Sequence, residues 1–500
     1  MTPTRRRAVG LAVAAAALFA TVGAAQQQPA SPSTSSRQAP IAPATRPDRS
    51  KPPALGPAPQ LKLPPIQKRT LTNGLSVWVV EAHKVPLVQV NLLIQAGSGD
   101  DPTGKFGVAS LTAAMLDEGA GARSALQIAD DVEFLGANLA TSSSFDASAV
   151  RLNVPAARLA AALPIMADVA LRPTFPQAEL DRVRQERLTS LIQARDDPAQ
   201  VAPLAFARVV YGAPHRYGTA AMGTAATLKA FTTADLRAFH TAMYQPANAT
   251  LVVAGDIRAD TVLPLLEKQF GGWKATAAST RSPVPAAPQL TARQVTIVDM
   301  PGAEQSQVRI GWVGVPRSTP DYFTLQVLNT ILGGSFTSRL NQNLREKNQF
   351  SYGASSRFDM RLSPGPFFAG AGVQTDKTAD ALREFFNELT AISKISADEL
   401  SKAKNYVALG FPSEFETIQD LASHLEEMIV YKLPDDYFER YVANIQAVTA
   451  DAVQKAVATY IQPGKFAVVV AGDRKAIEAG VRNLNLGPVR VVTIDEVVGS

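Results

Sequence analysis

The 500-residue sequence contains no cysteine. Disulfide bonds, thiolate metal sites, a cysteine nucleophile and a lipid-modified N-terminal cysteine are therefore all excluded. Histidine is scarce as well, with four residues in the whole chain. The formal net charge is only +5, and Arg5, Arg6 and Arg7 at the N-terminus supply three of these positive charges. A chain this close to neutral gives no reason to expect a nucleic-acid partner.

Long apolar runs are also rare, and the only one lies at the N-terminus. It extends over 18 residues from Ala8 to Ala25, follows three arginines and ends in small residues. This pattern is typical of a secretory signal peptide, so we expect residues 1–25 to be removed on export by either the general or the twin-arginine route. No other run approaches the roughly 20 apolar residues of a membrane helix, and we predict no membrane span after the signal is removed. Export without disulfides fits the periplasm of a Gram-negative bacterium.

Residues 26–65 are dominated by proline, alanine, serine and glutamine, and eleven of these forty residues are proline. Such a segment cannot bury enough apolar surface to offset the entropy lost on ordering. We therefore predict a disordered spacer over 26–65, followed by the globular part of the chain.

The globular part repeats itself. QVNLLIQAG at Gln89 corresponds to QVRIGWVGV at Gln307, an offset of 218, and LVVAGD at Leu251 corresponds to VVVAGD at Val468, an offset of 217. Two distant anchors with nearly the same offset indicate an internal duplication. Strand-like and helix-like runs alternate in both halves, which predicts an α/β (α+β) fold of two homologous domains, each a mixed β-sheet covered by helices. We place the domains at 66–273 and 295–500, with an Ala/Ser/Thr/Pro-rich linker at 274–294.

The most informative polar cluster lies in residues 331–353, ILGGSFTSRLNQNLREKNQFSYG. Gly333 and Gly334 follow one apolar helical run and precede a second predicted helix. Residues from 350 onward alternate as in a strand, and this strand carries Tyr352. Arg345 lies near the end of the preceding helix. We therefore expect Arg345 and Tyr352 to reach the floor of one cavity beneath a flexible glycine loop.

This cluster resembles the glycine-loop, Arg and Tyr segment of the M16 metallopeptidases, the family of pitrilysin, insulysin and the mitochondrial processing peptidase. The duplication and the sequence YQPANATLVVAGD are similar to the short-form M16B members over residues 67–491. The resemblance implies that Arg345 and Tyr352, with Gly333 and Gly334, bind substrate. In the family, the Arg and Tyr face the zinc site from the opposite half of the molecule or from a partner subunit.

The zinc motif of the family is absent from its expected place. M16 enzymes carry His-x-x-Glu-His on a helix, where two histidines and a downstream glutamate bind zinc and the intervening glutamate is the general base. In this sequence the motif positions correspond to Ser110, Ala113 and Ala114, and the third-ligand position to Ser190. None of these residues can bind zinc as the motif requires, so we expect no metal in this chain. None of the four histidines forms a replacement motif, and no nucleophile elbow, P-loop or dinucleotide fingerprint is present.

The resemblance also implies how a substrate is held. In the family an extended peptide adds as a strand to a sheet edge, and the matching stretch runs from Asn138 to Ser142, including Ala140 and Thr141. An ordinary edge strand with no substrate remains the alternative for this stretch.

Three functional hypotheses follow. The favoured one resembles the zinc-free α subunit of the mitochondrial processing peptidase: a noncatalytic subunit, inactive alone, of a periplasmic heteromeric M16 zinc peptidase. A zinc-motif-bearing M16 partner would complete the heterodimer and supply the zinc, and an extended peptide would be the substrate. The alternative is a binding or scaffold protein that reuses the fold without a role in proteolysis. A self-sufficient hydrolase is the third hypothesis, and it requires ligands that the sequence does not offer.

Overall fold

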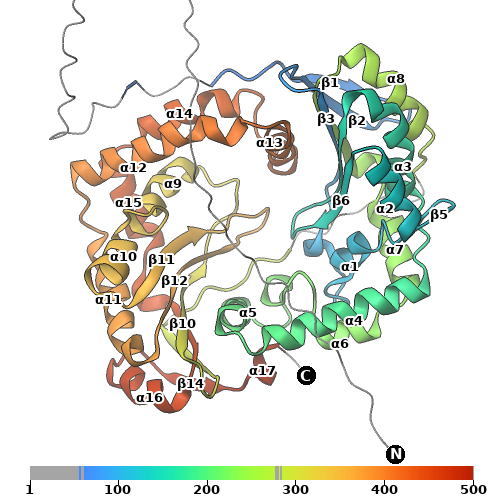
Figure 1. The fold of residues 1–500 in the computed structure, drawn as a ribbon. Coiled ribbons are helices and arrows are strands. Elements are labelled where there is room, and N and C mark those ends of the chain that lie inside the picture. Colours follow the sequence, from blue (N-terminus) through green and yellow to red (C-terminus); the bar gives the residue numbers. More distant parts are fainter. Residues whose placement is uncertain (1–55, 58–60, 276–280, 282–283, 499–500) are drawn as a thin grey trace, which may run out of the picture. The chain divides into compact units, whose positions relative to one another are not determined.

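The computed structural model describes residues 56–57, 61–275, 281 and 284–498. The expected signal peptide and almost all of the expected spacer lie outside these residues, as does part of the expected linker. The described chain contains two six-stranded mixed sheets with helices packed around them (Figure 1). The predicted α/β fold with two homologous domains is therefore confirmed.

The first sheet has the strand order β1-β2-β8-β3-β7-β6. Its strands are β1 (Gln67–Thr70), β2 (Ser76–Glu81), β3 (Leu87–Ile94), β6 (Asn138–Ser143), β7 (Ser148–Pro155) and β8 (Ala249–Gly255), and a small hairpin is formed by β4 (Gly119–Ala120) and β5 (Arg123–Ser124). The helices of this domain are α1 (Val108–Ala114), α2 (Ala125–Phe134), α3 (Leu159–Leu171), α4 (Gln177–Ala194), α5 (Pro198–Tyr211), α6 (Ala225–Ala230), α7 (Thr233–Met243) and α8 (Ala259–Phe270).

The second sheet has the order β14-β9-β13-β10-β12-β11. Its strands are β9 (Gln294–Asp299), β10 (Gln305–Val313), β11 (Ser351–Phe358), β12 (Pro366–Gln374), β13 (Ala467–Gly472) and β14 (Val489–Val492). The helices of this domain are α9 (Tyr322–Leu332), α10 (Arg339–Asn341) continued by the π-helical segment η5 (Gln342–Lys347), α11 (Thr378–Ala391), α12 (Ala397–Gly410), α13 (Ile418–Tyr431), α14 (Tyr437–Ala447), α15 (Ala450–Tyr460), α16 (Arg474–Asn483) and α17 (Ile494–Val498). None of the helices in the described part of the chain combines the length and the apolar character needed to cross a bilayer.

The two strand orders show the duplication directly. β2, β8, β3, β7 and β6 correspond in position to β9, β13, β10, β12 and β11, and the parallel pair β2–β8 matches the parallel pair β9–β13. The outermost strands next to β2 and β9 differ, because β1 runs antiparallel to β2 whereas β14 runs parallel to β9. Strands β6 and β11 are thus equivalent sheet edges, one in each domain.

One helix of each domain packs against the sheet of the other domain. Helix α5 packs against β10 and β13, and helix α13 packs against β3 and β8. The rings of Phe206 on α5 and Phe368 on β12 lie 6.5 Å apart, and Asn91 on β3 donates a hydrogen bond to Glu426 on α13 at 2.6 Å. The duplication offset carries α5 onto α13, so the exchange is reciprocal.

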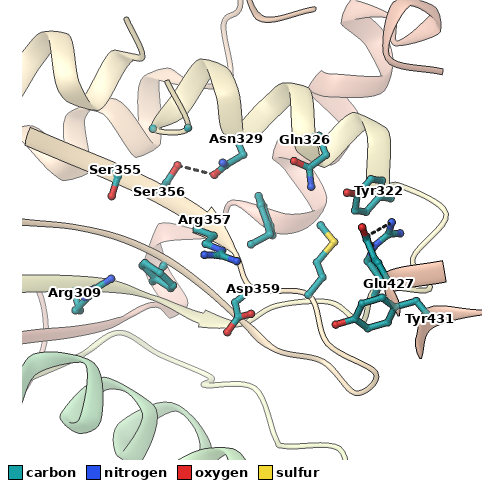
Figure 2. A pocket seen from close by; sticks show the side chains of 16 residues that line it. Arg309, Tyr322, Gln326, Asn329, Ser355, Ser356, Arg357, Asp359, Glu427 and Tyr431 are labelled. Carbon is teal, nitrogen blue, oxygen red and sulfur yellow. Dashed lines mark hydrogen bonds and ion pairs between the residues drawn. The ribbon is translucent and has the colours of Figure 1, made fainter. Parts of the chain in front are cut away.

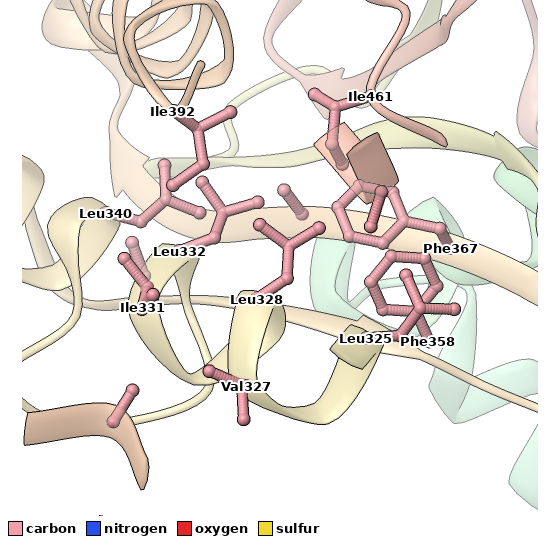
Figure 3. Close-up of a cluster of buried hydrophobic side chains, with 14 of the residues drawn as sticks. Leu325, Val327, Leu328, Ile331, Leu332, Leu340, Phe358, Phe367, Ile392 and Ile461 are labelled. Carbon is pink, nitrogen blue, oxygen red and sulfur yellow. The ribbon is translucent and has the colours of Figure 1, made fainter. Parts of the chain in front are cut away.

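The hydrophobic core of the second domain extends into the first. Leu325, Leu328 and Leu332 point from α9 onto Phe358 and Phe367 of the sheet (Figure 3). The same cluster of buried side chains also includes four residues of the first sheet, namely Val80, Leu93, Val252 and Ala254. Burial of apolar surface is the main driving force of folding, so the two domains stabilise each other through this shared core.

Candidate functional site

Helix α1 carries the positions that match the zinc motif, and a buried ion pair sets where this helix begins. The carboxylate of Asp101 accepts hydrogen bonds from the backbone N–H groups of Gly107 at 2.6 Å and Ala109 at 2.9 Å. Arg216 donates to the same carboxylate at 2.8 Å, and the two side chains are 4% and 0% exposed. Gly107 has a φ of 106°, which glycine adopts without steric conflict. These contacts satisfy N–H groups that a helix start leaves unpaired, and they hold α1 in place.

The three motif positions on α1 do not fit a zinc ion. They present one hydroxyl group, on Ser110, and two methyl groups, on Ala113 and Ala114. A cation already occupies the space beside Ser110, because Arg187 on α4 donates to the Ser110 hydroxyl at 3.2 Å and to its backbone carbonyl at 2.9 Å. Burial lowers the pKa of Arg187 to about 10, which leaves the guanidinium charged at neutral pH. A fixed positive charge repels a divalent cation, so the residues present here do not fit the zinc ion that the resemblance implies.

The third-ligand position is also unsuited to metal binding. Ser190 lies on the exposed side of α4 and donates its hydroxyl to the backbone carbonyl of Glu186 at 3.0 Å. The Glu186 carboxylate accepts from Arg182 at 2.8 Å. Within the described ranges no three His, Cys, Asp or Glu side chains come together in a way that could hold a metal ion.

Each of the four histidines has partners within the fold. His83 hydrogen-bonds to Asp256 at 2.7 Å, and this bond raises its pKa. His215 contacts the Pro285 carbonyl at 2.8 Å, and His240 contacts the Ala170 carbonyl at 2.9 Å. His424 stacks on Phe415 with the ring centroids 4.2 Å apart. These contacts are those of structural histidines.

Strand β6 contains the predicted peptide-binding residues and is an open sheet edge. Asn138 and Ala140 are exposed and Thr141 is half-buried. β6 pairs only with β7, and no other described segment forms a backbone hydrogen bond with its outer side. Burial raises the pKa of Asp117, which lies beside Thr141. The unpaired backbone groups of such an edge are able to pair with an added strand.

The equivalent edge β11 is closed by its own chain. The backbone N–H of Ser356 donates to the Gly333 carbonyl at 3.1 Å, and that of Ala354 donates to the Asn341 side chain at 3.2 Å. A Cβ atom on Gly333 would lie 2.3 Å from the backbone nitrogen of Ser356. Gly333 is therefore needed for close packing against the strand. The glycine segment covers an edge and is not the free loop that the sequence suggested.

Gly333 and Gly334 also line a cavity of about 740 Å³ between β11, α9 and α13 (Figure 2). This volume lies in the range of small-ligand sites. The lining is polar and charged, and Figure 2 shows the guanidinium of Arg357 directed into the middle of the lining side chains. The cavity is thus a candidate binding site that contains two of the predicted residues.

Both acidic side chains of the cavity are paired. Arg317 donates to Glu427 at 3.0 Å, and Arg361 donates to Asp359 at 2.5 Å. Burial opposes ionisation of Glu427, but hydrogen bonds from His424 and Arg317 together lower its pKa. The carboxylates are therefore neutralised by neighbouring cations.

Two further arginines of the cavity have no carboxylate partner in the described part of the chain. They are Arg309, whose guanidinium lies 4.5 Å from the ring centroid of Phe368, and the exposed Arg357. Burial lowers the pKa of Arg309. Neither arginine was among the residues predicted from the sequence. The sequence feature that could have indicated Arg309 is the presence of an arginine within the mostly apolar strand QVRIGWVGV.

Arg345 and Tyr352 lie outside this cavity, contrary to expectation. The Arg345 guanidinium is 4.5 Å from the ring centroid of Phe336. Within the described residues its ion-pair partner is the adjacent Glu346, at 3.4 Å. Tyr352 is 90% exposed, and Phe336 is 59% exposed. The strand register of β11 shifts just after Ser351, and this irregularity turns Tyr352 away from the sheet. The predicted pair therefore belongs to an exposed surface.

Similar proteins are found among both sequences and structures. A protein of Mycobacterium tuberculosis described as an uncharacterized zinc protease is 26% identical over 414 residues, which cover 81% of this chain and 93% of that protein. A crystal structure of a peptidase M16 inactive domain from Pseudomonas fluorescens matches with a TM-score of 0.76 and 27% identity, covering 81% of this chain and 98% of that one. The first half of a periplasmic protease from Escherichia coli shares the fold at 19% identity, with a TM-score of 0.67, covering 87% of this chain and 100% of that one.

Two family models match successive parts of the chain. Residues 76–211 match the insulinase family (peptidase family M16), and residues 230–407 match the peptidase M16 inactive domain. Together the two segments span more than half of the chain. The first lies within the first domain, and the second begins in the first domain and extends into the second. The chain therefore belongs to the M16 peptidase family.

Proposed function

We propose that this chain is a noncatalytic subunit of a heteromeric M16 zinc peptidase. A zinc-motif-bearing M16 partner would provide the metal and the general base. This chain would bind the peptide and contribute Arg345 and Tyr352 in trans. The proposal rests mainly on the exposure of the Phe336 and Tyr352 side chains and on Arg345, whose guanidinium forms an ion pair with no residue of the described chain except Glu346.

The open edge of β6 supports the peptide-binding part of the proposal. An extended peptide gains backbone hydrogen bonds from a free strand edge whatever its sequence, and alternate side chains set its specificity. The equivalent edge β11 is closed by Gly333 and Asn341, so of these two edges only β6 is offered to a strand from outside.

The side chains of the exposed surface suit contact with a reacting peptide. A guanidinium such as that of Arg345 forms two parallel hydrogen bonds with a carboxylate, or donates to a peptide carbonyl. The phenol of Tyr352 would donate to the oxygen on which negative charge develops during amide cleavage. Removal of one such donor typically lowers the rate on the order of 100-fold.

The proposal also includes export to the periplasm by the N-terminal segment 1–25. A structural relative described as a periplasmic protease supports this compartment. Cell fractionation of the native host with an antibody to the globular part would test it, and a cytoplasmic location would contradict it.

The central experiment is peptide cleavage by this chain alone, by a zinc-motif M16 protein of the same genome alone, and by the two coexpressed. We expect turnover only in the coexpressed complex, and zinc in the complex and in the partner but not in this chain alone. Arg345→Ala and Tyr352→Phe should each lower the turnover number of the complex about 100-fold with unchanged assembly. Arg440→Ala and Tyr406→Phe remove an arginine and an exposed tyrosine elsewhere on the same domain and serve as matched controls.

The outcomes separate the alternatives. If the two chains do not associate, or if the mixture cleaves no faster than the partner alone, the scaffold hypothesis replaces the proposal. If this chain alone binds zinc and cleaves peptide, it is a self-sufficient hydrolase. If the complex is active but its turnover number is unchanged by Arg345→Ala and by Tyr352→Phe, these residues have no part in the reaction.

A further inference from the structure

The cavity between β11, α9 and α13 contains more positive charge than its own carboxylates neutralise. Arg357 forms no ion pair in the described chain, and neither does Arg309. The Nε atom of Arg309 is buried and has no hydrogen-bond partner among the described atoms. A guanidinium remains charged at all physiological pH values. The half-buried guanidinium of Arg309 contacts the ring of Phe368 but no carboxylate of the described chain. An anion that enters the cavity therefore gains a charge interaction that the chain itself does not supply.

The strand register places both arginines on the same face of the second sheet. Gly370 on β12 pairs with Arg309 on one side and with Ser355 on the other. Arg357 follows Ser355 by two residues and therefore projects from the same face. The two strands β10 and β11 are separated by β12, a distance of about 10 Å. On the middle strand, Gly370 leaves room beside Arg309, and Phe368, which pairs with Arg357, places its ring 4.5 Å from the Arg309 guanidinium. Both arginines therefore line the cavity on either side of the Phe368 ring.

The remaining charges of the cavity set the charge of the ligand. Arg317 and Glu427 neutralise each other, and Asp359 is held by Arg361. The uncompensated positive charge is therefore limited to Arg309 and Arg357, which is too little for a highly charged polyanion such as a triphosphate. A singly charged group that accepts two parallel hydrogen bonds fits better, and a carboxylate has this chemistry.

We propose that this cavity binds a carboxylate of a peptide, held by Arg357 and Arg309. The carboxylate comes either from an acidic side chain or from the C-terminus of the peptide. This inference rests on the peptide-binding part of the proposed function and adds a substrate class to it, namely acidic or C-terminal segments.

A chain of contacts links the cavity to the open edge of β6. Ser142 on β6 accepts a hydrogen bond from Arg151 at 2.6 Å. The same arginine donates to Glu426 on α13 at 3.0 Å. The next residue, Glu427, lines the cavity. Helix α13 thus connects the open edge of β6 with the cavity, because it contacts Arg151 through Glu426 and lines the cavity through Glu427.

Isothermal titration calorimetry with the purified chain tests the inference without any partner. The probes are three hexapeptides: acetyl-Val-Ser-Thr-Glu-Thr-Val-amide, the same peptide with Gln in place of Glu, and the Gln peptide with a free C-terminal carboxylate. We expect at least one anionic probe to bind at least tenfold tighter than the neutral one. Arg357→Gln and Arg309→Gln should each remove most of this ratio. Arg158→Gln, which removes an exposed arginine of the first domain, is the charge-matched control and should leave the ratio unchanged.

Each outcome decides a separate point. Tighter binding of the Glu peptide assigns the site to acidic side chains, and tighter binding of the free-acid peptide assigns it to chain termini. Equal affinity for all three peptides overturns the carboxylate site, and so does an equal loss with Arg158→Gln. Variants that unfold at a lower temperature than the wild-type chain are replaced by Arg357→Lys and Arg309→Lys, which keep the charge and should lose only the bidentate contact. Failure of this test leaves the Arg345 and Tyr352 experiment unaffected, because that experiment measures turnover of the complex.

Discussion

The guanidinium of Arg187 lies against the turn of α1 that carries Ser110, and no carboxylate pairs with it in the described ranges. The Arg187 side chain thus lies beside the helix positions that match the zinc motif. The loss of the metal ligands and the presence of this cation act in the same direction, because each alone opposes metal binding.

Restoring zinc binding should therefore require the removal of Arg187 in addition to the four substitutions that rebuild the motif. We predict that Ser110→His, Ala113→Glu, Ala114→His and Ser190→Glu together leave the chain with far less than one zinc per molecule. Adding Arg187→Ala should raise the zinc affinity on the order of 100-fold, because it removes a positive charge adjacent to the ion. Zinc content after dialysis, measured by mass spectrometry, gives the answer. Arg158→Ala added to the same four changes is the control, and full zinc occupancy with Arg187 retained would contradict the prediction.

A glycine is required at position 333 because the backbone there lies very close to strand β11. Its α-carbon faces β11, where a Cβ would lie 2.3 Å from the nitrogen and 2.6 Å from the hydroxyl of Ser356. We predict that Gly333→Ala lowers the free energy of unfolding by about 1–3 kcal/mol, because the segment must move and its hydrogen bond to Ser356 lengthens. Gly410→Ala is the control, since nothing lies within 4 Å of a Cβ at that position. Chemical denaturation measures both, and equal stability of the two variants would refute the packing argument.

At the scale of elements, α10 and η5 are fastened to α12 by one bidentate ion pair. Arg339 on α10 donates to both oxygens of Glu399, at 2.6 and 2.9 Å. Glu399 also accepts from the backbone N–H of Ser396 at 2.9 Å and so completes the capping box of α12. The hydrogen bonds from Arg339 and Ser396 lower the pKa of Glu399 to about 2. The position of the segment that carries Arg345 is thus coupled to an ionised carboxylate.

This coupling predicts a pH dependence of stability. The pKa in the folded chain is below the ordinary value of 4.5, so the contribution of Glu399 is complete above pH 4.5 and is lost as the pH falls toward 2. We expect Glu399→Gln to lower the free energy of unfolding by about 2 kcal/mol at pH 7, after allowance for partial solvent screening. The difference between the two proteins should fall below half of that value at pH 3. Urea titrations at both pH values test this, and a difference independent of pH would disprove the assignment.

The two equivalent edge strands differ in whether a further strand can pair with them. β6 leaves its outer side open, whereas the glycine segment and Asn341 close β11. Exposed strand edges are prone to unwanted pairing, so closure of one edge protects the domain. The open edge is then the one that a peptide can use.

At the scale of the whole molecule, the exchange of α5 and α13 makes the domains interdependent. α13 covers strands of the first sheet, and α5 covers strands of the second. Val80, Leu93 and Val252 of the first sheet are at most 1% exposed and belong to the core cluster of the second domain. Neither domain can keep its own apolar residues from water without the other.

We therefore predict that residues 66–273 expressed alone do not form a stable monomer. The uncovered face of the first sheet should bind a hydrophobic dye and lead to aggregation. Coexpression with residues 284–500 should restore a soluble one-to-one complex with the melting behaviour of the intact chain. Size-exclusion chromatography with dye binding measures this, and a soluble, dye-negative first domain would show that the exchange is dispensable.

The sequence by itself determined the features that repeat or that depend on neighbouring residues. The duplication was visible as two anchors with nearly the same offset, at Gln89 and Leu251. The alternating and helical runs predicted the α/β class, which the two sheets confirm. The resemblance to the family identified Ser110, Ala113 and Ala114 as the zinc-motif positions, and the absence of zinc from this chain stays a prediction.

Only the tertiary structure decided which distant side chains meet. Arg187 contacts Ser110 across 77 positions of sequence. Arg309 and Arg357 share a cavity because β12 lies between their strands. Tyr352 is exposed because of a local register shift that alternation alone does not reveal. Periodicity along the chain reports which face of an element a residue occupies, whereas the packing of whole elements determines what that face meets.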